Sequence, residues 1–387
     1  MKKILVIHTK YRIFGGEDSN ITDEIEHLKK NFTVEYLKFD NAKKLNLTDY
    51  IAFITRSNFD SNKILRNKIK EFSPDIVYVH NTWFKGNLGV LSILNKEKLL
   101  TILKIHNFRF DCTKTFLFKS HLDNQKYCPK CGLKNMKKKF FNKYYPDSTI
   151  KSLLINWYGR KYIDILKNNN LQIFVLNSFY KNFLQSIGIA ETKIDISYNP
   201  IDIQITPSYD SNSDYVVYAG ALNSEKGIIE LLNSWKKSRG SLKLYLIGTG
   251  KLEGELITKY SDQKTIFTGS LENSEVLEII KKSRAVITAT KMFEGQPRLL
   301  FEAASFGVPS IYPSFGGMDE YFPDDYEFSF EQFNYLDLEK KISLLQNQAL
   351  LEKESERTYT HVVNLLENSR IHESINNAYQ KRKATVE

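Results

Sequence analysis

Cysteine is scarce in this sequence: its 387 residues include only Cys112, Cys128 and Cys131. Three is too small and too odd a number for a disulfide framework, so the disulfide-rich secreted class is excluded. Long apolar runs are also missing, and none reaches the roughly 18 residues that a membrane-spanning helix needs. Residues 4–8 follow two lysines but are too short for the apolar part of a signal peptide, and they predict a β-strand instead. These shortages together predict a cytoplasmic protein.

The spacing of the three cysteines leaves a metal site open as an alternative. Cys112 precedes a Cys128-x-x-Cys131 pair, and His121 or His106 could supply a fourth ligand to a structural zinc ion. Three reduced thiols in a reducing compartment explain the same residues, and a single C-x-x-C is weak support for zinc. We therefore favour free thiols.

The sequence also lacks the motifs of nucleic-acid-binding modules, since no helix-turn-helix, zinc-finger or RNA-binding signature can be identified. Its formal net charge is nevertheless +10, which indicates an anionic partner unless the charge serves solubility alone. Positive charge is concentrated in residues 134–166, where Lys and Arg are interspersed with Phe, Tyr and Trp. This composition suits a segment that contacts the anionic inner face of the cell membrane. It suits equally an amphipathic helix that covers a domain core.

Apolar strand patterns alternate with helical patterns along both halves of the chain, which predicts parallel, doubly wound α/β sheets. A stretch rich in Pro, Ser, Asn and Asp at residues 194–214 interrupts the alternation and marks a linker. We predict an N-terminal Rossmann-like, acceptor-binding domain at 1–198 and a C-terminal Rossmann-like, donor-binding domain at 199–365. Residues 366–387 are predicted to form a final helix that can pack back on the first domain. Two such domains bind a ligand in the cleft that they face.

The most informative motif is EGQPRLLFEAASFGVPSI at residues 294–311. Pro297 suits the first position of a helix, and Gly307 suits its end. Glu294 then precedes the helix start and Glu302 lies in its second turn, with an anion-binding helix N-terminus between them. A phosphate flanked by two hydroxyl-bearing sugars fits this layout, and a nucleotide sugar has that chemistry.

These residues resemble those of retaining, family 4-type glycosyltransferases, which have two Rossmann domains in the GT-B architecture (glycosyl transferases group 1). The resemblance is carried by YAGALNSEKGIIELL (218–232), LIGTG (246–250), IFTGSL (266–271), the motif at 294–311 and SFGGMDEYF (314–322). The first half matches more loosely, through Gly15-Gly16, His106-Asn107 and YNPID (198–202).

The resemblance implies a donor-binding set in the second half. Lys226 would place its ammonium on the diphosphate, and Glu302 would accept hydrogen bonds from the ribose hydroxyls. Glu294 would lie against the transferred sugar and stabilise positive charge near the anomeric carbon. An arginine of the family's pattern is replaced by Ala221, and Arg298 is the nearest substitute in the motif. Leu299 and Leu300 complete the predicted donor contacts.

In the first half, the resemblance implies that His106 contacts the donor sugar or the departing phosphate. Gly16, with its neighbour Gly15, would let backbone amides approach a phosphate or an acceptor closely, although a plain strand-to-helix turn explains the same glycines. No Asp-x-Asp pair occurs, so we expect no cofactor and no requirement for a divalent metal; Lys226 and the helix dipole would neutralise the leaving group.

The sequence therefore predicts a retaining glycosyltransferase that moves a sugar from a UDP- or GDP-sugar to a glycan or lipid-linked acceptor. A role in cell-surface polysaccharide or glycoconjugate biosynthesis is expected. Two alternatives stay open: a nucleotide-sugar epimerase on the same scaffold, and a non-catalytic, basic nucleic-acid-binding protein. An epimerase needs no acceptor, and a nucleic-acid binder would show strongly salt-dependent binding without affinity for nucleotide sugars.

Overall fold

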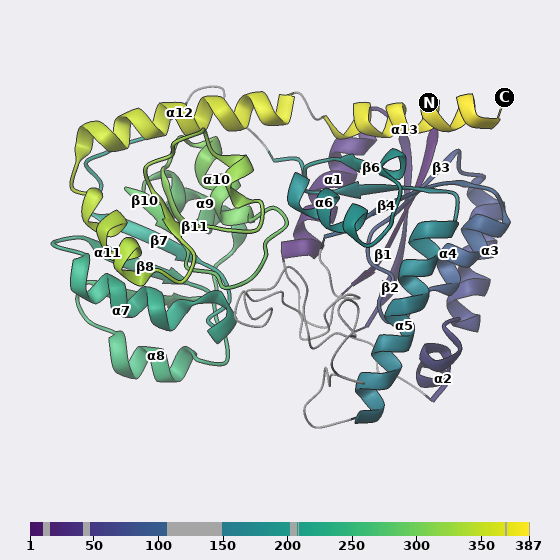
Figure 1. Cartoon of the computed structure of the whole chain (residues 1–387), viewed down its shortest axis with the longest axis horizontal. Helices are drawn as coiled ribbons and strands as arrows, with labels where there is room; N and C mark the ends of the chain where they lie inside the picture. Colours follow the sequence, from purple (N-terminus) through teal and green to yellow (C-terminus); the bar gives the residue numbers. More distant parts are fainter. Residues whose placement is uncertain are drawn as a thin grey trace. The chain divides into compact units, whose positions relative to one another are not determined.

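The computed structural model describes residues 1–10, 16–41, 47–106, 149–201, 207, 209–367 and 370–386. Two compact units divide the chain (Figure 1): residues 1–200 together with 369–387, and residues 201–368. Cys112, Cys128 and Cys131 lie outside the described residues, so the structure does not test whether they bind zinc. Among the described residues, no helix combines the length and the apolar character that crossing a bilayer requires.

The first unit is built on a six-stranded parallel sheet in the order β2-β1-β3-β4-β5-β6. Its strands are β1 (Lys3–Lys10), β2 (Thr33–Asp40), β3 (Ile76–Val79), β4 (Leu100–Lys104), β5 (Leu171–Val175) and β6 (Ile194–Ile196). Its helices are α1 (Gly16–Lys29), α2 (Leu47–Thr55), α3 (Phe59–Phe72), α4 (Gly89–Lys96), α5 (Thr149–Asn168), α6 (Ser178–Ser186), the 3-10 turn η1 (Glu191–Lys193) and α13 (Ile371–Val386). The inner strands are almost wholly buried, as apolar strands covered by helices on both faces must be.

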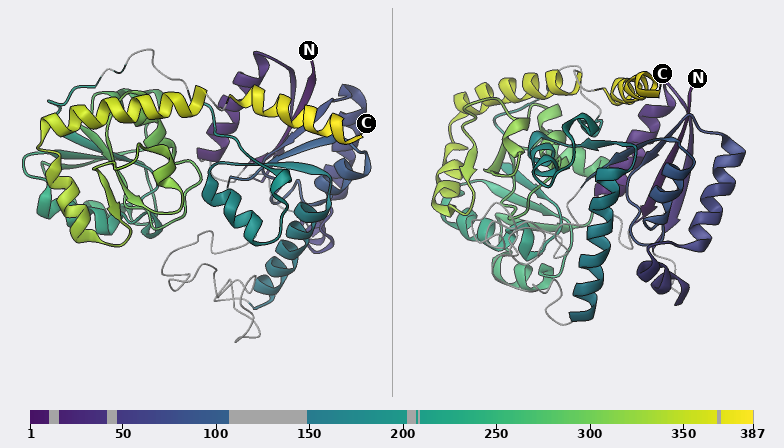
Figure 2. Two further views of the ribbon diagram at one scale, coloured as in Figure 1. Left: turned by 45° about the horizontal axis from the view of Figure 1, so that its top comes forward. Right: turned by 45° about the vertical axis from the view of Figure 1, so that its right-hand side comes forward.

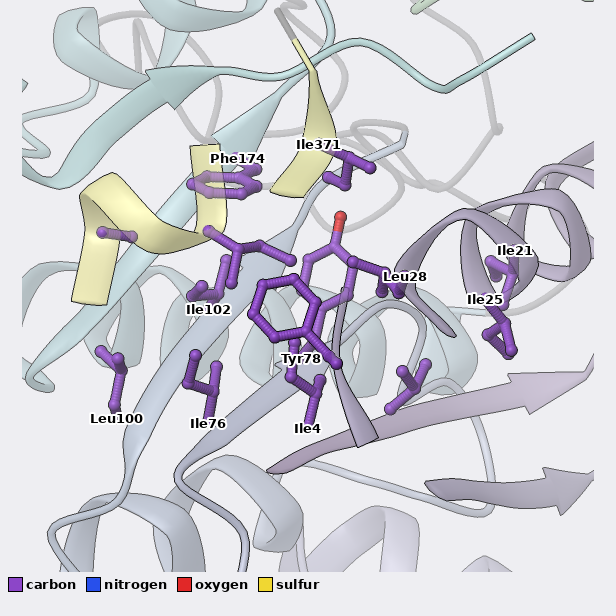
Figure 3. Close-up of a cluster of buried hydrophobic side chains, with 14 residues drawn as sticks. Ile4, Ile21, Ile25, Leu28, Ile76, Tyr78, Leu100, Ile102, Phe174 and Ile371 are labelled. Carbon is purple, nitrogen blue, oxygen red and sulfur yellow. The ribbon is translucent and has the colours of Figure 1, made fainter. Parts of the chain in front are cut away.

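The C-terminal helix α13 belongs to this first unit. Its residues Ile371 and Ile375 pack in one buried cluster with Tyr78 of β3, Phe174 of β5 and Leu28 of α1 (Figure 3). Figure 2 shows α13, the yellow helix that ends at the C-terminus, beside the purple α1, which it contacts. The end of the chain therefore completes the core of the domain that its beginning starts.

The second unit contains another six-stranded parallel sheet, in the order β12-β11-β10-β7-β8-β9. Its strands are β7 (Tyr215–Ala219), β8 (Lys243–Ile247), β9 (Thr265–Gly269), β10 (Ala285–Ile287), β11 (Ser310–Ser314) and β12 (Ser329–Glu331). Its helices are η2 (Ser224–Lys226), α7 (Ile228–Ser238), α8 (Glu253–Tyr260), α9 (Asn273–Lys281), α10 (Arg298–Ser305), η3 (Met318–Tyr321), α11 (Tyr335–Leu344) and α12 (Gln348–Glu367). The predicted fold class, two α/β domains with parallel sheets, is confirmed.

Candidate functional site

The two glutamates of the central motif flank the start of α10 in the second unit. Glu294 lies in the loop after β10, and Glu302 lies in the second turn of the helix, as the sequence predicts. The predicted position of Pro297 is wrong by one residue, because its ψ of 107° is extended and makes it the N-cap. The helix therefore begins at Arg298, and it ends just before Phe306 and Gly307.

The structure brings Lys226 and Glu294 together, although they are 68 residues apart in sequence. The Nζ atom of Lys226 lies 2.7 Å from Oε1 of Glu294, and the hydroxyl of Thr290 donates to the same oxygen at 2.9 Å. Both charged side chains are partly buried, with 28% of Lys226 and 18% of Glu294 exposed. Such a pair is shielded from bulk water yet still open to a ligand.

The backbone that carries Lys226 depends on the glycine that follows it. Gly227 has a φ of +65°, a left-handed conformation that glycine adopts without a steric penalty. A Cβ atom at this position would lie only 1.9 Å from the carbonyl oxygen of Ala289. Gly227 thus lets the backbone after η2 pack directly against Ala289, which follows β10. This contact places Lys226 beside Glu294.

Glu302 forms the second ion pair of the site. Its Oε1 atom accepts a hydrogen bond from Nε of Arg298 at 2.5 Å, one helical turn earlier, and only 10% of the Glu302 side chain is exposed. Of the two predicted leucines, Leu300 is fully buried and its amide donates to the carbonyl of Pro297, while Leu299 keeps some exposed surface.

Three residues that the sequence analysis did not single out hold the Glu294 loop. The hydroxyl of Tyr321 donates to the carbonyl of Gly295 at 2.5 Å, and the amide of Gln332 donates to the carbonyl of Thr290 at 2.9 Å. Phe315 stacks on Phe293 of the loop, with ring centroids 4.1 Å apart. Tyr321 and Phe315 both belong to the SFGGMDEYF segment, so that motif contained the signal that could have identified them.

In the first unit, His106 follows β4 and pairs with a second histidine that follows β3. Nδ1 of His80 lies 2.9 Å from Nε2 of His106, and the rings stack at 5.3 Å. His80 is buried, whereas His106 keeps some exposed surface. Burial lowers the pKa of both histidines well below the usual value, so both rings are neutral near pH 7.

A buried carboxylate on α1 supports these histidines. Oε1 of Glu24 accepts hydrogen bonds from Lys104 Nζ at 2.5 Å and from the Tyr78 hydroxyl at 2.9 Å, and its Oε2 lies 3.6 Å from Nε2 of His80. None of the Glu24 or Lys104 side chain is exposed. Burial lowers the pKa of Lys104, and the carboxylate of Glu24 partly offsets this. A lysine inside the apolar run at 101–106 was the sequence signal for this network.

Gly16 is the first residue of α1, the next described element after β1. Two residues later, Oδ1 of Asp18 lies 2.9 Å from Nε2 of His8, which is in β1. Both side chains are buried, so the helix start is fastened to the strand. In the part of the chain that the structure describes, no three His, Cys, Asp or Glu side chains gather into a group that could hold a metal ion.

Comparison with known families gives this second unit an identity. Residues 203–361 match the family model of glycosyl transferases group 1. These residues form a glycosyl transferases group 1 domain. The domain lies within the second unit and contains both ion pairs of the α10 site. The resemblance inferred from the sequence is thereby confirmed at the level of this family.

A curated relative aligns with a smaller part of the chain. Over 148 residues it is 31% identical to lipopolysaccharide 1,6-galactosyltransferase of Salmonella typhimurium. The alignment covers 35% of this chain and 41% of that relative, so the chain matches about two-fifths of the relative's length.

Solved structures resemble the whole chain. Sucrose-phosphate synthase from Thermosynechococcus elongatus has a TM-score of 0.71 at 12% identity, with 100% of both chains covered. The HepE protein of Anabaena, solved in complex with UDP-glucose, has a TM-score of 0.67 at 12% identity, again with 100% of both chains covered. At these identities the likeness shows the fold, and it confirms the predicted GT-B architecture.

Proposed function

We propose that this chain is a retaining glycosyltransferase that moves a sugar from a nucleoside diphosphate sugar to an acceptor hydroxyl. The observation that carries the proposal is the pair of carboxylate–cation contacts, Lys226 with Glu294 and Arg298 with Glu302, at the start of α10. A diphosphate needs cations to balance its negative charge. The sugars on either side of it present hydroxyls that donate hydrogen bonds to carboxylates. The N-terminus of α10 adds the positive end of a helix dipole between the two acids.

Lys226 is the proposed ligand of the diphosphate. Its ammonium has three hydrogens, so a diphosphate oxygen can bind it while Glu294 keeps one hydrogen bond. Glu294 also stays oriented by Thr290, 2.9 Å away. We assign Glu294 to the hydroxyls of the transferred sugar and to the positive charge that develops near the anomeric carbon. The bond from that carbon to the diphosphate oxygen breaks on the face where the acceptor oxygen attacks, so the configuration is retained.

Glu302 is assigned to the ribose hydroxyls, and Arg298 to a second contact with the diphosphate. Arg298 keeps Glu302 in place through Nε, and a guanidinium has further N–H donors for a phosphate oxygen. Lys226, Arg298 and the helix dipole together supply positive charge to the leaving group, so we propose that transfer needs no divalent metal. His106 is assigned the contact to the donor sugar or the departing phosphate.

The donor class is proposed from the relatives. The Anabaena structure contains UDP-glucose, and the Salmonella relative is a lipopolysaccharide galactosyltransferase. A UDP-hexose is therefore the first donor to test, with GDP-sugars as the alternative. We propose a glycan or lipid-linked acceptor in cell-surface polysaccharide or glycoconjugate biosynthesis, at the cytoplasmic side of the membrane.

The experiment incubates the purified full chain with UDP- and GDP-sugars and measures binding by calorimetry and slow hydrolysis of the donor, with and without a chelator. Lys226→Ala and Glu294→Gln are each expected to lower donor hydrolysis at least about a hundredfold, as loss of a group that stabilises transition-state charge does, and Glu302→Gln is expected to weaken donor binding through its lost ribose contact. Lys237→Ala is the matched control, because it removes a similar ion pair, 2.8 Å long, with Glu339 on the same unit.

Activity that persists in all three site variants would refute the assignment of these residues. Interconversion of two nucleotide sugars without an acceptor would favour the epimerase, and loss of activity with the chelator would refute metal independence. The anomeric configuration of the first product, read by NMR, decides between retention and inversion.

A further inference from the structure

Helix α2 of the first unit is apolar on both of its faces. Ala52 and Phe53 point inward and are buried, and Phe53 stacks on Tyr158 of α5 with ring centroids 5.0 Å apart. On the outer face, Tyr50, Ile51 and Ile54 each expose at least half of their surface. Large apolar side chains that are grouped and exposed on one helix face mark a contact surface, so the outer face of α2 indicates a further contact.

Helix α5 continues this apolar face. Ile150, Leu153 and Trp157 are spaced by three and four residues, which places them on one side of the helix, and they expose 72%, 51% and 38% of their surface. Helices α2 and α5 contact each other, and Figure 1 shows both at the same end of the unit. We define the apolar surface as these three residues together with Tyr50, Ile51, Ile54 and Phe59.

A basic cavity adjoins the apolar surface. It has a volume of about 380 Å³ and lies among α3, α4, α5 and the residues that follow α2, and four cationic side chains line it: Arg56, Arg66, Lys96 and Lys161. Arg66 pairs with Glu97 and Lys161 pairs with Asp164, so four positive charges meet two negative ones and positive charge is in excess. Ser57 and Asn62 add polar groups to the lining.

Arg56 joins the two features. It lines the cavity, and its guanidinium carbon lies 3.6 Å from the ring centroid of Trp157 in a cation–π contact. The apolar surface and the basic cavity are thus adjacent parts of one face of the first unit. Tryptophan, tyrosine and arginine are the side chains that favour the boundary between lipid headgroups and acyl chains.

We propose that this face binds an anionic phospholipid bilayer, with the apolar surface in the interfacial region and a lipid phosphate in the basic cavity. A soluble phosphate would use the cations but would leave the seven apolar side chains in water. A second copy of the chain would bring two cavities of the same charge together. This membrane contact rests on the proposed function. A lipid-linked acceptor lies in a membrane, so a chain that transfers a sugar to it has to reach the membrane surface.

The test is co-sedimentation of the full chain with vesicles of phosphatidylcholine alone or of phosphatidylcholine mixed with phosphatidylglycerol. Binding to the anionic vesicles is expected, and it should fall by about tenfold or more in Lys96→Glu and in the double variant Ile51→Ser with Ile54→Ser. These positions are exposed, so the fold is expected to tolerate the changes. Lys282→Glu and Leu336→Ser, at exposed positions of the second unit, are the matched controls and should bind as the wild type does.

Failure to bind anionic vesicles, or binding that neither variant weakens, would overturn the proposal. Binding of inorganic phosphate that Lys96→Glu abolishes, without vesicle binding, would assign the cavity to a soluble ligand instead. A dimer in solution that the Ile51 and Ile54 changes dissociate would assign the apolar surface to a second copy. Donor hydrolysis in solution, measured on the same variants, tests the proposed function separately and is expected to be unchanged.

Discussion

His80 and His106 share one hydrogen bond, between Nδ1 of the first ring and Nε2 of the second, across 2.9 Å. Because both rings are neutral, one of these nitrogens must carry the hydrogen and the other must accept it. Nε2 of His80 faces Oε2 of Glu24 at 3.6 Å, and a carboxylate favours a hydrogen on the nitrogen nearest to it. His80 then accepts at Nδ1 and His106 donates from Nε2.

This arrangement predicts that His106 holds its proton on Nε2 and presents the lone pair of Nδ1. The hydrogen of a ligand hydroxyl would be accepted at that atom. Long-range proton–nitrogen NMR spectra of histidine-labelled protein check this directly, with the partly exposed His372 as the reference ring. A spectrum that shows the proton of His106 on Nδ1 would contradict the prediction, as would a protonated His80 near neutral pH.

Removing one partner of the Glu24–Lys104 ion pair should cost far more stability than replacing both partners by uncharged residues. Glu24→Gln leaves the ammonium of Lys104 buried without its counter-charge, and we expect a loss of about 3–5 kcal/mol in the first unit. The double variant Glu24→Gln with Lys104→Met should recover most of that loss, because no unpaired charge remains. Hydrogen exchange of the β3 and β4 amides measures the opening free energy of this unit. Equal losses in the single and double variants would contradict the argument.

The same histidines predict how stability changes with pH. Their pKa in the folded protein lies well below the ordinary value of 6.5, so below pH 6.5 the unfolded chain binds protons that the folded chain does not. Stability is then fully present above that pH and falls as the pH drops, by up to about 1.4 kcal/mol per pH unit for each histidine. Lys104, His8, Glu24 and Tyr78 surround His80, and burial outweighs the attraction of the single carboxylate.

Opening free energies of the first unit, measured by hydrogen exchange between pH 8 and 5 (about the range where histidine titrates), check this slope. Replacing His106 by Gln should reduce the slope. A stability that rises on acidification below pH 6.5 would contradict the burial of two neutral rings.

The alternating apolar pattern of the sequence predicted both parallel sheets, because strand and helix periods are local properties of the chain. The pairs that form the sites join residues far apart in sequence, so they could not be predicted from local pattern. Glu294 could be named from its place before a predicted helix start and Lys226 through the resemblance to a family, but nothing in their spacing showed that they form an ion pair. Glu24 was missed because a glutamate in an amphipathic helix normally faces solvent, and only the fold shows that this one meets Lys104.

Gly227 is predicted to be irreplaceable, because its left-handed φ and the nearby carbonyl of Ala289 both oppose a side chain. Gly227→Ala should destabilise the second unit by more than about 1 kcal/mol and weaken donor binding, since it displaces Lys226. Gly254→Ala is the control: it lies in α8, no atom comes within 4 Å of its added Cβ, and alanine favours helices by about 1 kcal/mol. Thermal unfolding and calorimetry of both variants check this, and a Gly227→Ala protein as stable as the wild type would contradict it.

The replacement of the family's arginine by Ala221 predicts a rescue. If Arg298 supplies the missing charge, Arg298→Ala should weaken UDP binding by about tenfold, which corresponds to about 1.4 kcal/mol. That result alone would be ambiguous, because Arg298 also holds Glu302 at 2.5 Å. Ala221 is exposed just after β7, so an arginine can be placed there without disturbing a core.

Adding Ala221→Arg to Arg298→Ala should therefore restore UDP binding if the diphosphate charge was what Arg298 provided. Calorimetry of the wild type, both single variants and the double variant completes the cycle. Ala221→Lys is the matched control, because an ammonium carries the charge without the planar, bidentate geometry of a guanidinium, and it should restore binding only in part. If the double variant binds no better than Arg298→Ala, the role of Arg298 is to position Glu302, and the diphosphate relies on Lys226 and the helix N-terminus.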